Sequence, residues 1–360
     1  MRDQQRQSVT SHSSKLGPRK ADLGSWKRKG EQLRLSRLLG QGSFSDVHAL
    51  SNHSEQGEAS LTVRATSSAT LNLDDDFDAG LVAIKRLKAN VRERAVRASA
   101  GHSAVEDFLY EAEILSRLPK HENVINILAV SDGFWEDPKN GYLVLERVHD
   151  TLEQKIRGWA MLEKAKRPRA HPFGLLPSCS AKAMSLQERQ RKRIQMSALG
   201  IAEGMKFLHS QKIVYRDLKP SNCAFALDGT VKILDFGLSR PHFDDGDDAC
   251  RRLTGLVGTL RYMAPEVAAS QKYSFAADVY SFAILLWNIC TLDMPFKHLD
   301  SIKQWYKHVV ESGKRPPNKR RLIASPQISE LLLRCWSGNA SDRPPFEKVC
   351  LELKQEVNSF

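Results

Sequence analysis

Short apolar runs of strand-like composition dominate the first part of the chain. Their aliphatic and β-branched residues, bounded by Gly, Ser, Asn or Asp, are typical of β-strands. The runs are LRLSRLLG (33–40), SDVHAL (45–50), LVAIKRL (81–87), VINILAV (124–130) and YLVLERV (142–148). They predict that residues 33–148 form a β-rich region.

Apolar residues recur at helical spacing in three longer segments. VEDFLYEAEILSRL (105–118) is the one main helix expected among the strands; its apolar face holds Val105, Phe108, Leu109, Ala112, Leu115 and Leu118. Residues 190–209 and 274–291 predict long helices in the second part of the chain, the latter buried. A strand-rich part followed by a helix-rich part predicts an α+β fold of two unequal lobes with a cleft between them. The larger, mostly helical lobe is residues 149–360.

Three segments lack this patterning. Residues 1–32 are rich in Ser, Gln and basic residues, which predicts a disordered basic tail. Residues 51–80 are rich in Ser, Asn and Gly and read as an insertion in a hairpin. Residues 158–185 include the prolines of RPRAHPFGLLPSC, which suit an inserted loop in the second lobe.

The charge balance raises the question of nucleic-acid binding, because the formal net charge is +12. Much of the excess lies in the tail and in the basic run Lys155–Lys192. Neither run contains an aromatic ladder or the cysteine and histidine spacing of a zinc finger. We therefore interpret them as a solvated tail and insert, and do not expect a nucleic-acid partner.

Cysteine usage and hydropathy indicate the compartment. The six cysteines are scattered without a CxxC pair, which fits unpaired thiols in a reducing environment. The N-terminus is polar, Arg2 excludes a myristoylation signal, and the apolar run at 282–290 is too short to span a bilayer. The sequence predicts an intracellular protein without a membrane span, located in the cytoplasm, with the nucleus also open.

A glycine-containing turn separates the first two predicted strands. In GQGSFSDV (40–47) the glycines would let the backbone turn tightly and approach phosphate oxygens. An ordinary hairpin turn explains the same residues, so this motif alone does not decide between the two. The candidate phosphate-binding residues are Gly40, Gln41, Gly42, Ser43 and Phe44, and Ser45 stands where such loops usually carry a third glycine.

Lys85 lies on the strand-like run VAIK, where a buried ammonium would need a partner. The helix at 105–118 offers Glu111 and Glu113, and the helical register favours Glu111. We predict a Lys85–Glu111 ion pair that holds the ammonium against the α- and β-phosphates of a nucleotide. An edge lysine exposed to water is the alternative.

The remaining motifs carry a family resemblance. YRDLKPSN (215–222), DFG (235–237), GTLRYMAPEV (258–267) and Arg343 in SDRPPF follow the glycine turn, VAIK and the helix glutamate in order. From about residue 33 to 358, this set resembles the eukaryotic protein kinase superfamily.

The resemblance implies a role for each polar residue of these two loops. Asp217 would orient the substrate hydroxyl and accept its proton, and Lys219 would balance charge on the transferring γ-phosphoryl group. Asn222 and Asp235 would hold magnesium, with manganese as an alternative, through hard oxygen ligands. ATP would be the phosphoryl donor.

By the same resemblance, several residues would support the loops. Thr259 would reach the loop near Asp217, Glu266 would pair with Arg343, and Asp278 would brace the loop backbone. Tyr215 replaces the usual histidine and would stack with Phe236 and Leu115.

The adenine pocket can be placed by register in the resembling family. Leu145 would close the rear of the pocket, and the hinge backbone that pairs with adenine would be at Glu146 and Val148. Val47 and Ala83 would cover the ring. Ala224 stands where a leucine is usual, so we expect a floor with less apolar contact.

DLKPSN with GTxxYMAPE is the serine/threonine pattern, and ADVYSFAILLWNICT, LLLRCW and DRPPF resemble the tyrosine-kinase-like branch. The implied function is transfer of the γ-phosphoryl group to Ser/Thr hydroxyls of protein substrates in intracellular signalling. The alternative is a pseudokinase scaffold with weak nucleotide binding. Thr254, beside Arg251 and Arg252, is the candidate site for an activating kinase or for autophosphorylation.

Overall fold

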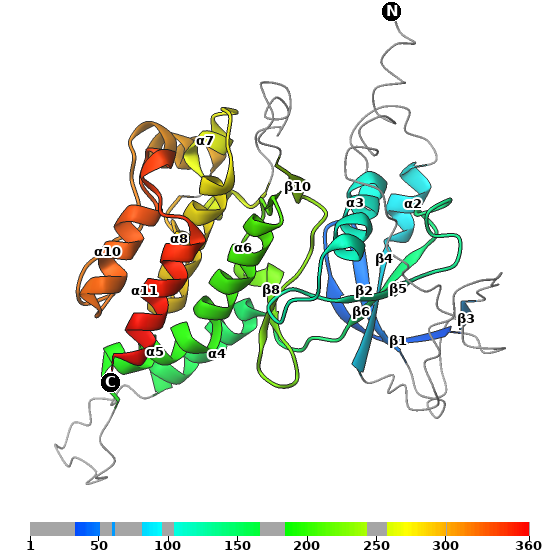
Figure 1. The fold of residues 1–360 in the computed structure, drawn as a ribbon, viewed down its shortest axis with the longest axis horizontal. Coiled ribbons are helices and arrows are strands. Elements are labelled where there is room, and N and C mark those ends of the chain that lie inside the picture. The colour runs from blue at the N-terminus through cyan, green and yellow to red at the C-terminus, as the bar shows by residue number, and fades with distance from the viewer. Residues whose placement is uncertain are drawn as a thin grey trace, which may run out of the picture. The chain divides into compact units, whose positions relative to one another are not determined.

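The computed structural model describes residues 33–50, 60–61, 81–95, 104–165, 184–242, 258–299 and 301–359 (Figure 1). The chain forms two compact units. The first contains the chain up to Pro119 and Ile127–Glu146, and the second contains Lys120–Asn126 and the chain from Arg147 onward. The first is built around a sheet and the second is mostly helical (Figure 1). This confirms the predicted α+β fold of two unequal lobes.

Among the described residues, the first unit contains an antiparallel sheet of six strands in the order β3–β1–β2–β4–β6–β5. Five of the strands fall on the predicted runs, and the sixth, the two-residue β3, lies in the predicted insertion and pairs with β1. The strands are β1 (Leu33–Gln41), β2 (Ser45–Leu50), β3 (Ser60–Leu61), β4 (Val82–Leu87), β5 (Ile127–Val130) and β6 (Tyr142–Glu146).

The two faces of this sheet carry different kinds of side chain, since successive residues of a strand point to opposite faces. One face carries a buried apolar cluster of Val82, Ile84, Ala129 and Val144. Lys85, on the other face, is directly opposite Val47 on β2 and Leu143 on β6. Directly opposed residues point to the same side of a sheet, so a charged residue and apolar residues share this second face.

Among the described residues, the first unit contains the helices α2 and α3. α2 (Ala89–Ala95) is a short helix after β4 that the sequence did not indicate. α3 (Ala104–Arg117) is the predicted main helix, and it buries Phe108, Ala112 and Leu115 of the predicted apolar face. Glu111 is buried on the same helix, so one polar residue of α3 needs a partner inside the unit.

The second unit is built around long helices that the periodicity predicts. The run predicted at 190–209 lies in a continuous helical stretch of α5 (Leu186–Arg193), a π-helical segment (Ile194–Ala198) and α6 (Leu199–Ser210). α8 (Phe275–Thr291) is buried at every position from Ala277 to Cys290, in agreement with its mostly apolar composition, and it buries the polar residues Asp278, Ser281 and Asn288 as well. The other helices are α4 (Leu152–Ala165), α7 (Pro265–Ala268), α9 (Ile302–Trp305) continued by a π-helical segment (Tyr306–Glu311), α10 (Pro326–Cys335) and α11 (Phe346–Asn358).

Short strand pairs fix the loops that carry the polar motifs. β7 (Ile213–Val214) pairs with β10 (Arg240–Pro241), and β8 (Cys223–Phe225) pairs with β9 (Val231–Ile233). The YRDLKPSN run therefore leaves β7 and enters β8, while the DFG run follows β9.

The apolar run 124–130 is divided between the two units, although the sequence predicts one strand. Only Ile127–Val130 forms β5. Earlier in the run, the Ile125 amide donates to the Ile233 carbonyl (3.0 Å), and the Ile233 amide donates to the Asn123 carbonyl (2.9 Å). The first half therefore pairs with β9 in the second unit.

Candidate active site

The turn between β1 and β2 is tight, and its tip is exposed. The Gly42 amide donates to the Ser45 carbonyl (2.8 Å), and a Cβ at Gly42 would lie 3.3 Å from that same oxygen. Gly40 pairs with Val47 across the two strands. Gln41, Gly42, Ser43 and Phe44 are exposed. The loop has the geometry of a hairpin with a solvent-facing tip, and its role in phosphate binding stays a prediction.

Lys85 on β4 and Glu111 on α3 form a buried ion pair. The Lys85 Nζ donates to Glu111 Oε1 (2.7 Å) and Oε2 (2.6 Å), and the two residues are 7% and 2% exposed. Glu113, the other candidate partner, pairs with Arg117 (2.8 Å) on the partly exposed side of α3. The predicted Lys85–Glu111 pair is confirmed. Removing either member would leave a buried charge uncompensated, at a cost of about 3–5 kcal/mol.

The residues predicted to surround adenine are divided between the units. In the first unit Ala83 on β4 lies opposite Leu145 on β6, and Glu146 ends β6 opposite Val82. In the second unit Val148 is half-buried after β6, and Ala224 is fully buried on β8. Their part in nucleotide binding stays a prediction.

Asp217 is the centre of a dense polar network in the second unit. Its Oδ2 accepts from the Lys219 Nζ (2.5 Å) and from the Asn222 Nδ2 (2.9 Å). Its Oδ1 accepts from the Thr259 amide (3.0 Å) and hydroxyl (3.2 Å). The predicted approach of Thr259 to Asp217 is confirmed. A carboxylate held on both oxygens has a fixed orientation, as a group that acts on a substrate requires.

Burial dominates the electrostatics of Asp217. The residue is 7% exposed, and desolvation raises the pKa of its carboxyl above the usual range. The Lys219 ammonium opposes this effect, while the nearby Asp235 carboxylate adds to it. A carboxylate with a raised pKa is a better proton acceptor than an exposed one.

Asn222 and Asp235 are linked through the backbone. The Leu234 amide, next to Asp235, donates to the Asn222 carbonyl (2.8 Å). Asn222 uses its Nδ2 to donate to the Asp217 carbonyl (3.0 Å) and Oδ2 (2.9 Å), so its Oδ1 is the atom suited to a cation. Asp235 is exposed and has a left-handed backbone, with φ of 58°. Left-handed conformations of non-glycine residues cluster at functional sites.

The donor set at these two residues fits a hard divalent cation. An amide oxygen and a carboxylate are the oxygen ligands that magnesium prefers, together with phosphates and water. In the part of the chain that the structure describes, no cluster of three or more His, Cys, Asp or Glu side chains could hold a metal by itself. Such a two-residue set would bind the cation jointly with a nucleotide.

Asp278 on α8 braces the loop before Asp217. Its Oδ2 accepts from the Tyr215 amide (2.8 Å) and its Oδ1 from the Arg216 amide (2.8 Å), and Oδ2 also contacts the His209 Nε2 (2.9 Å). Arg216 has a φ of 75°, so this carboxylate holds a strained backbone. The predicted bracing by Asp278 is confirmed.

Tyr215 is fully buried and packs edge-on against Phe236, with ring centroids 5.4 Å apart. Its hydroxyl donates to the Leu234 carbonyl, which satisfies the one polar atom of the side chain. Burial raises the pKa of this phenol well above its usual value, so it stays neutral. Tyr215 therefore ties the loop of Asp217 to the segment that leads into Asp235.

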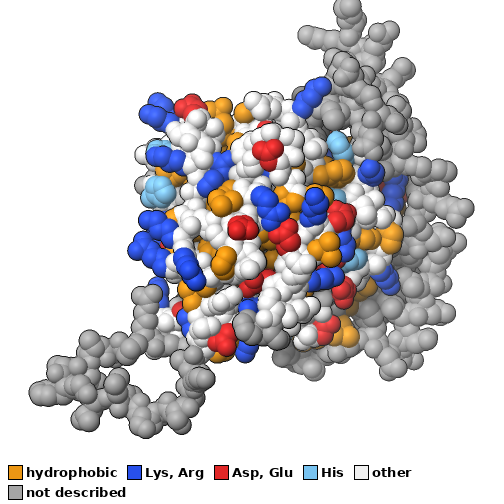
Figure 2. All heavy atoms as spheres, turned by 60° about the vertical axis from the view of Figure 1, so that its left-hand side comes forward, with side chains coloured by type: hydrophobic (Ala, Val, Ile, Leu, Met, Phe, Trp, Pro, Cys, Tyr) orange, Lys and Arg blue, Asp and Glu red, His pale blue; other side chains and the backbone are white. Residues whose placement is uncertain are grey.

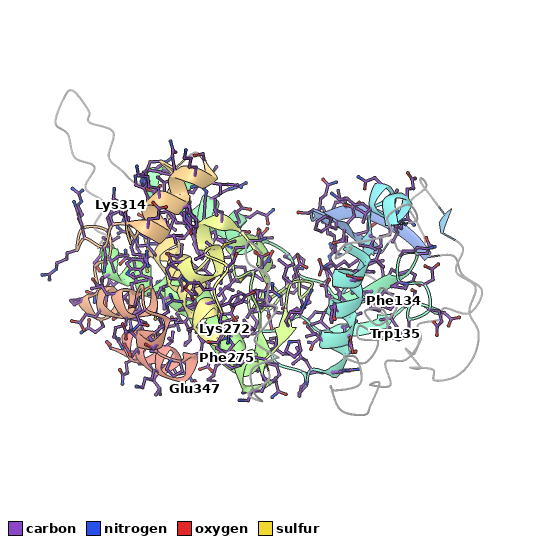
Figure 3. All side chains as sticks on the ribbon, turned by 90° about the horizontal axis from the view of Figure 1, so that it is seen from above. Phe134, Trp135, Lys272, Phe275, Lys314 and Glu347 are labelled. Atoms are coloured by element: carbon purple, nitrogen blue, oxygen red, sulfur yellow. The ribbon has the colours of Figure 1, made fainter. Side chains whose placement is uncertain are left out.

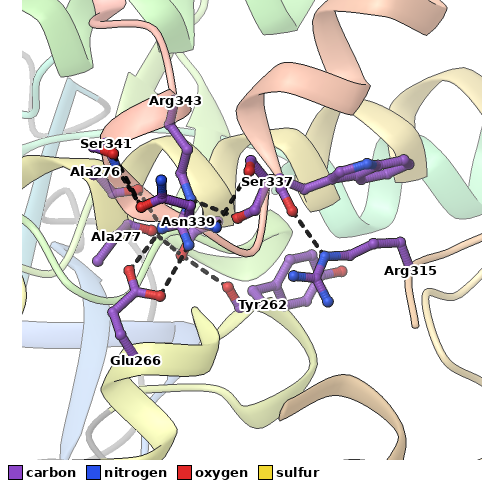
Figure 4. A network of polar contacts seen from close by, with 11 residues as sticks. Tyr262, Glu266, Ala276, Ala277, Arg315, Ser337, Asn339, Ser341 and Arg343 are labelled. Carbon is purple, nitrogen blue, oxygen red and sulfur yellow. Dashed lines mark hydrogen bonds and ion pairs between the residues drawn. The ribbon is translucent and has the colours of Figure 1, made fainter. Parts of the chain in front are cut away.

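Arg343 and Glu266 form the predicted ion pair, shown with its neighbours in Figure 4. The guanidinium donates to Glu266 Oε1 (2.6 Å) and Oε2 (2.9 Å). It also donates to the Ala276 carbonyl (2.9 Å) and to the Ser337 carbonyl (3.0 Å). The Arg343 side chain is 0% exposed. This pair anchors α7, at the end of the segment that carries Thr259, to the helical part of the unit.

Gly258 was missed by the sequence interpretation. Its φ is 106°, and a Cβ there would lie 2.8 Å from the Arg216 carbonyl oxygen and 3.4 Å from Asp217 Oδ1. Only glycine meets both demands, because it lacks the Cβ and tolerates positive φ. The GT dipeptide of GTLRYMAPEV was the available signal, since it places a glycine directly before a residue expected to approach Asp217.

One predicted site cannot be placed. Thr254, with Arg251 and Arg252, lies outside the described residues. Its phosphorylation stays a prediction.

The comparisons with known proteins agree with this geometry. A family model described as protein tyrosine and serine/threonine kinase matches residues 33–353. Because the match covers most of the chain, the chain belongs to the protein tyrosine and serine/threonine kinase family. The recognition of a eukaryotic protein kinase is confirmed.

The chain is also similar to individual protein kinases and receptors. It is 39% identical over 160 residues to the serine/threonine/tyrosine-protein kinase HT1 of Arabidopsis thaliana, covering 44% of this chain and 38% of that protein. It is 40% identical over 163 residues to a probable serine/threonine-protein kinase of Dictyostelium discoideum, covering 45% of this chain and 11% of that protein. It is 29% identical over 339 residues to the insulin-like growth factor 1 receptor of Bos taurus, covering 93% of this chain and 44% of the receptor. Each of these matches spans less than half of the relative's length.

Among the described residues, no helix is long and apolar enough to cross a membrane.

Proposed function

We propose that the chain is an ATP- and magnesium-dependent protein kinase that transfers the γ-phosphoryl group to Ser/Thr hydroxyls of protein substrates. The observation that carries this proposal is the network around Asp217, in which four hydrogen bonds fix a buried carboxylate. A structural carboxylate would not need the additional oxygen ligands that Asn222 and Asp235 present close by.

Asp217 is assigned the proton transfer. Its carboxylate accepts the proton of the substrate hydroxyl while the hydroxyl oxygen forms a bond to the γ-phosphorus. The bond between the γ-phosphorus and its bridging oxygen breaks, and the electron pair leaves with ADP. The raised pKa of the Asp217 carboxyl favours acceptance of this proton.

Lys219 is assigned charge compensation. Its ammonium lies 2.5 Å from Asp217 Oδ2, so a phosphoryl group brought to Asp217 would also meet this cation. Thr259 donates two hydrogen bonds to the other oxygen of Asp217, Oδ1, and so holds the carboxylate in one orientation. These residues lower the barrier by orientation and by electrostatic stabilisation.

The nucleotide is assigned to residues of both units. Lys85, held by Glu111, would contact the α- and β-phosphates, and the glycine turn Gly40–Phe44 would cover them. Asn222 and Asp235 would hold magnesium or manganese, which supplies neutralisation of phosphate charge. The adenine contacts proposed are Val47, Ala83, Glu146, Val148 and Ala224.

A pseudokinase scaffold is the weaker candidate. Such scaffolds usually lack at least one of the polar residues that serve catalysis, whereas Lys85, Asp217, Asn222 and Asp235 are all present here. The name of the relative from Dictyostelium discoideum, a probable serine/threonine-protein kinase, adds support for catalysis and for the hydroxyl class.

The acceptor residue can be tested directly. The full chain is incubated with ATP, magnesium and a generic basic protein, and the product is hydrolysed for phosphoamino-acid analysis. We expect phosphoserine and phosphothreonine. Phosphotyrosine alone would refute the acceptor class, and absence of any phosphoamino acid above an enzyme-free control would refute the transfer itself.

A further inference from the structure

The segment from residue 301 to residue 321, in the second unit, carries a large excess of positive charge. It holds seven Lys and Arg residues and one acidic residue, Glu311, so its excess of six positive charges is half of the formal net charge of +12. The basic runs considered from the sequence alone lie elsewhere. The cations of this segment are spread over its 21 residues, with consecutive basic residues only at Lys314–Arg315 and Lys319–Arg321.

Helix geometry and one backbone hydrogen bond bring the first three of these cations together. Lys303 and Lys307 are four residues apart on the helical stretch of α9 and its π-helical continuation, so they lie on neighbouring turns. The Lys314 amide donates to the His308 carbonyl (2.9 Å), which brings Lys314 back against the end of that stretch. Lys319, Arg320 and Arg321 follow on a turn, where the Leu322 amide donates to the Lys319 carbonyl (2.7 Å). We call Lys303, Lys307, Lys314, Lys319, Arg320 and Arg321 the basic surface.

All six side chains of the basic surface are exposed. Figure 2 turns this side of the second unit forward and shows Lys and Arg side chains collected along one edge. Figure 3 shows Lys314 at the outside of the unit. Among the described residues, none of the six forms an ion pair with an acidic side chain, in contrast to Lys297, which pairs with Asp293 (2.8 Å). Such a set raises the local concentration of anionic partners.

A rigid backbone supports the basic surface. Trp305 is 1% exposed, and the Trp287 indole donates to the Pro317 carbonyl (3.0 Å). Arg315 points inward, donates to the Trp336 carbonyl (2.8 Å) and lies over the Tyr280 ring. The Gln190 side chain donates to the Leu322 carbonyl and accepts from the Ala324 amide. The cations are thus presented from fixed positions, which lowers the entropic cost of binding a partner.

The surroundings favour a polypeptide partner over the other polyanions. Nucleic-acid surfaces combine cations with exposed aromatic side chains, but Trp305 is buried and Tyr306 is only half-exposed. A membrane surface would need a broad apolar face to insert, and here Ile302, 66% exposed, is the one large aliphatic side chain exposed in the segment. Ile302 lies exposed beside several cations, so the surface is complementary to an acidic peptide that contains an occasional apolar residue.

We propose that the basic surface is a docking site for an acidic segment of a protein partner, which it binds apart from the phosphorylated residue. This inference rests on the proposed function in one respect: the natural partner would be a protein substrate. An acidic segment held on the same unit as Asp217 would raise the effective concentration of the substrate hydroxyl.

The test is a binding measurement that does not depend on catalysis. A fluorescein-labelled peptide of about a dozen glutamates is titrated with the full chain, and anisotropy is followed at about 0.05 M and about 0.3 M salt. Two variants reverse the charge in halves of the surface: Lys303→Glu/Lys307→Glu/Lys314→Glu and Lys319→Glu/Arg320→Glu/Arg321→Glu. The control variant Lys164→Glu/Lys192→Glu/Lys348→Glu makes the same charge change at exposed lysines of the same unit.

We expect each surface variant to weaken peptide binding on the order of tenfold or more, and the higher salt to weaken wild-type binding. The control variant should bind the peptide with a Kd within about twofold of that of wild type, because its three lysines are separate, solvated charges. Equal weakening in the control, or no binding by wild type, would overturn the docking site. So would tighter binding of vesicles containing phosphatidylserine, or of a single-stranded oligonucleotide, through the same six residues.

A kinetic measurement separates this inference from the proposed function. With a serine peptide that carries an acidic extension, the surface variants should raise KM and leave kcat unchanged. The same peptide without the extension should give equal KM values for wild type and variants. An inactive chain that still shows the expected anisotropy pattern would refute the proposed function and leave the docking site standing.

Discussion

Among the described arginine–glutamate pairs, Arg343–Glu266 and Arg334–Glu352 have a similar forked geometry but very different burial. Comparing them tests what holds the second unit together. Arg343 pairs with Glu266, and its side chain is 0% exposed. Arg334 pairs with Glu352 through two hydrogen bonds, and its side chain is 45% exposed. We compare Arg343→Ala with Arg334→Ala.

The expected magnitudes follow from what each truncation leaves behind. Arg343→Ala removes four hydrogen bonds and leaves the Glu266 carboxylate, 10% exposed, with two backbone carbonyls that have lost a donor. Loss of one partner from a buried ion pair costs about 3–5 kcal/mol in the free energy of unfolding. Arg334→Ala leaves a carboxylate that water can solvate, so its cost is about 0.2–1 kcal/mol.

The assay is urea unfolding followed by tryptophan fluorescence, since Trp287, Trp305 and Trp336 are buried in the same unit as both pairs. We expect Arg343→Ala to lower the urea midpoint on the order of 1 M and Arg334→Ala to lower it several times less. Arg343→Lys should recover only part of the loss, because an ammonium cannot donate in the forked geometry of a guanidinium. Equal midpoints for the two alanine variants would refute the assignment of Arg343 as a structural anchor.

Three further outcomes are expected. Glu111→Gln should raise the KM for ATP and lower kcat by more than tenfold, because Lys85 loses its charged partner. Glu113→Gln should change neither constant, and equal effects of the two variants would contradict the Lys85–Glu111 pairing. Asp278→Asn places an amide donor against a backbone N–H, so it should lower the unfolding free energy by about 1–3 kcal/mol and abolish most of the phosphoryl-transfer rate. Asp228→Asn, at an exposed turn, should change neither quantity. Burial raises the folded-state pKa of Asp217, so its stabilising contribution is full below the unfolded pKa of about 3.9 and is lost as pH rises through the folded pKa. The unfolding free energy of wild type minus that of Asp217→Asn should therefore fall as pH rises from about 4, and a rise would show that the pKa is lowered instead.

Elements with regular patterning could be predicted from the sequence. β4 and α3 were found because a strand and a helix each repeat their apolar positions with a characteristic period. The same register separated Glu111 from Glu113, since only one of the two lies on the face that turns to the sheet. In the polar network of Asp217, the motif resemblance predicts the approach of Thr259 but not the hydrogen bonds from Lys219 and Asn222.

Other features depend on contacts that periodicity does not record. The run 124–130 is apolar except at Asn126, and hydrophobic periodicity alone does not show that pairing with β9 gives way to β5 at this residue. Gly258 is required by the carbonyl of Arg216, which is far away in the sequence. In the basic surface, Lys314 lies against the end of the helical stretch because its amide donates to the His308 carbonyl, a contact that the sequence does not show.

The central claim is that Asp217 serves a phosphoryl transfer, and the initial rate of transfer from radiolabelled ATP to a basic protein tests it most directly. Wild type is compared with Asp217→Asn, and with Asp228→Asn as the matched control. We expect Asp217→Asn to lower the rate by about 10²–10⁴-fold, the usual contribution of a positioned proton acceptor, and Asp228→Asn to leave it unchanged. Equal incorporation by wild type and Asp217→Asn would contradict the claim.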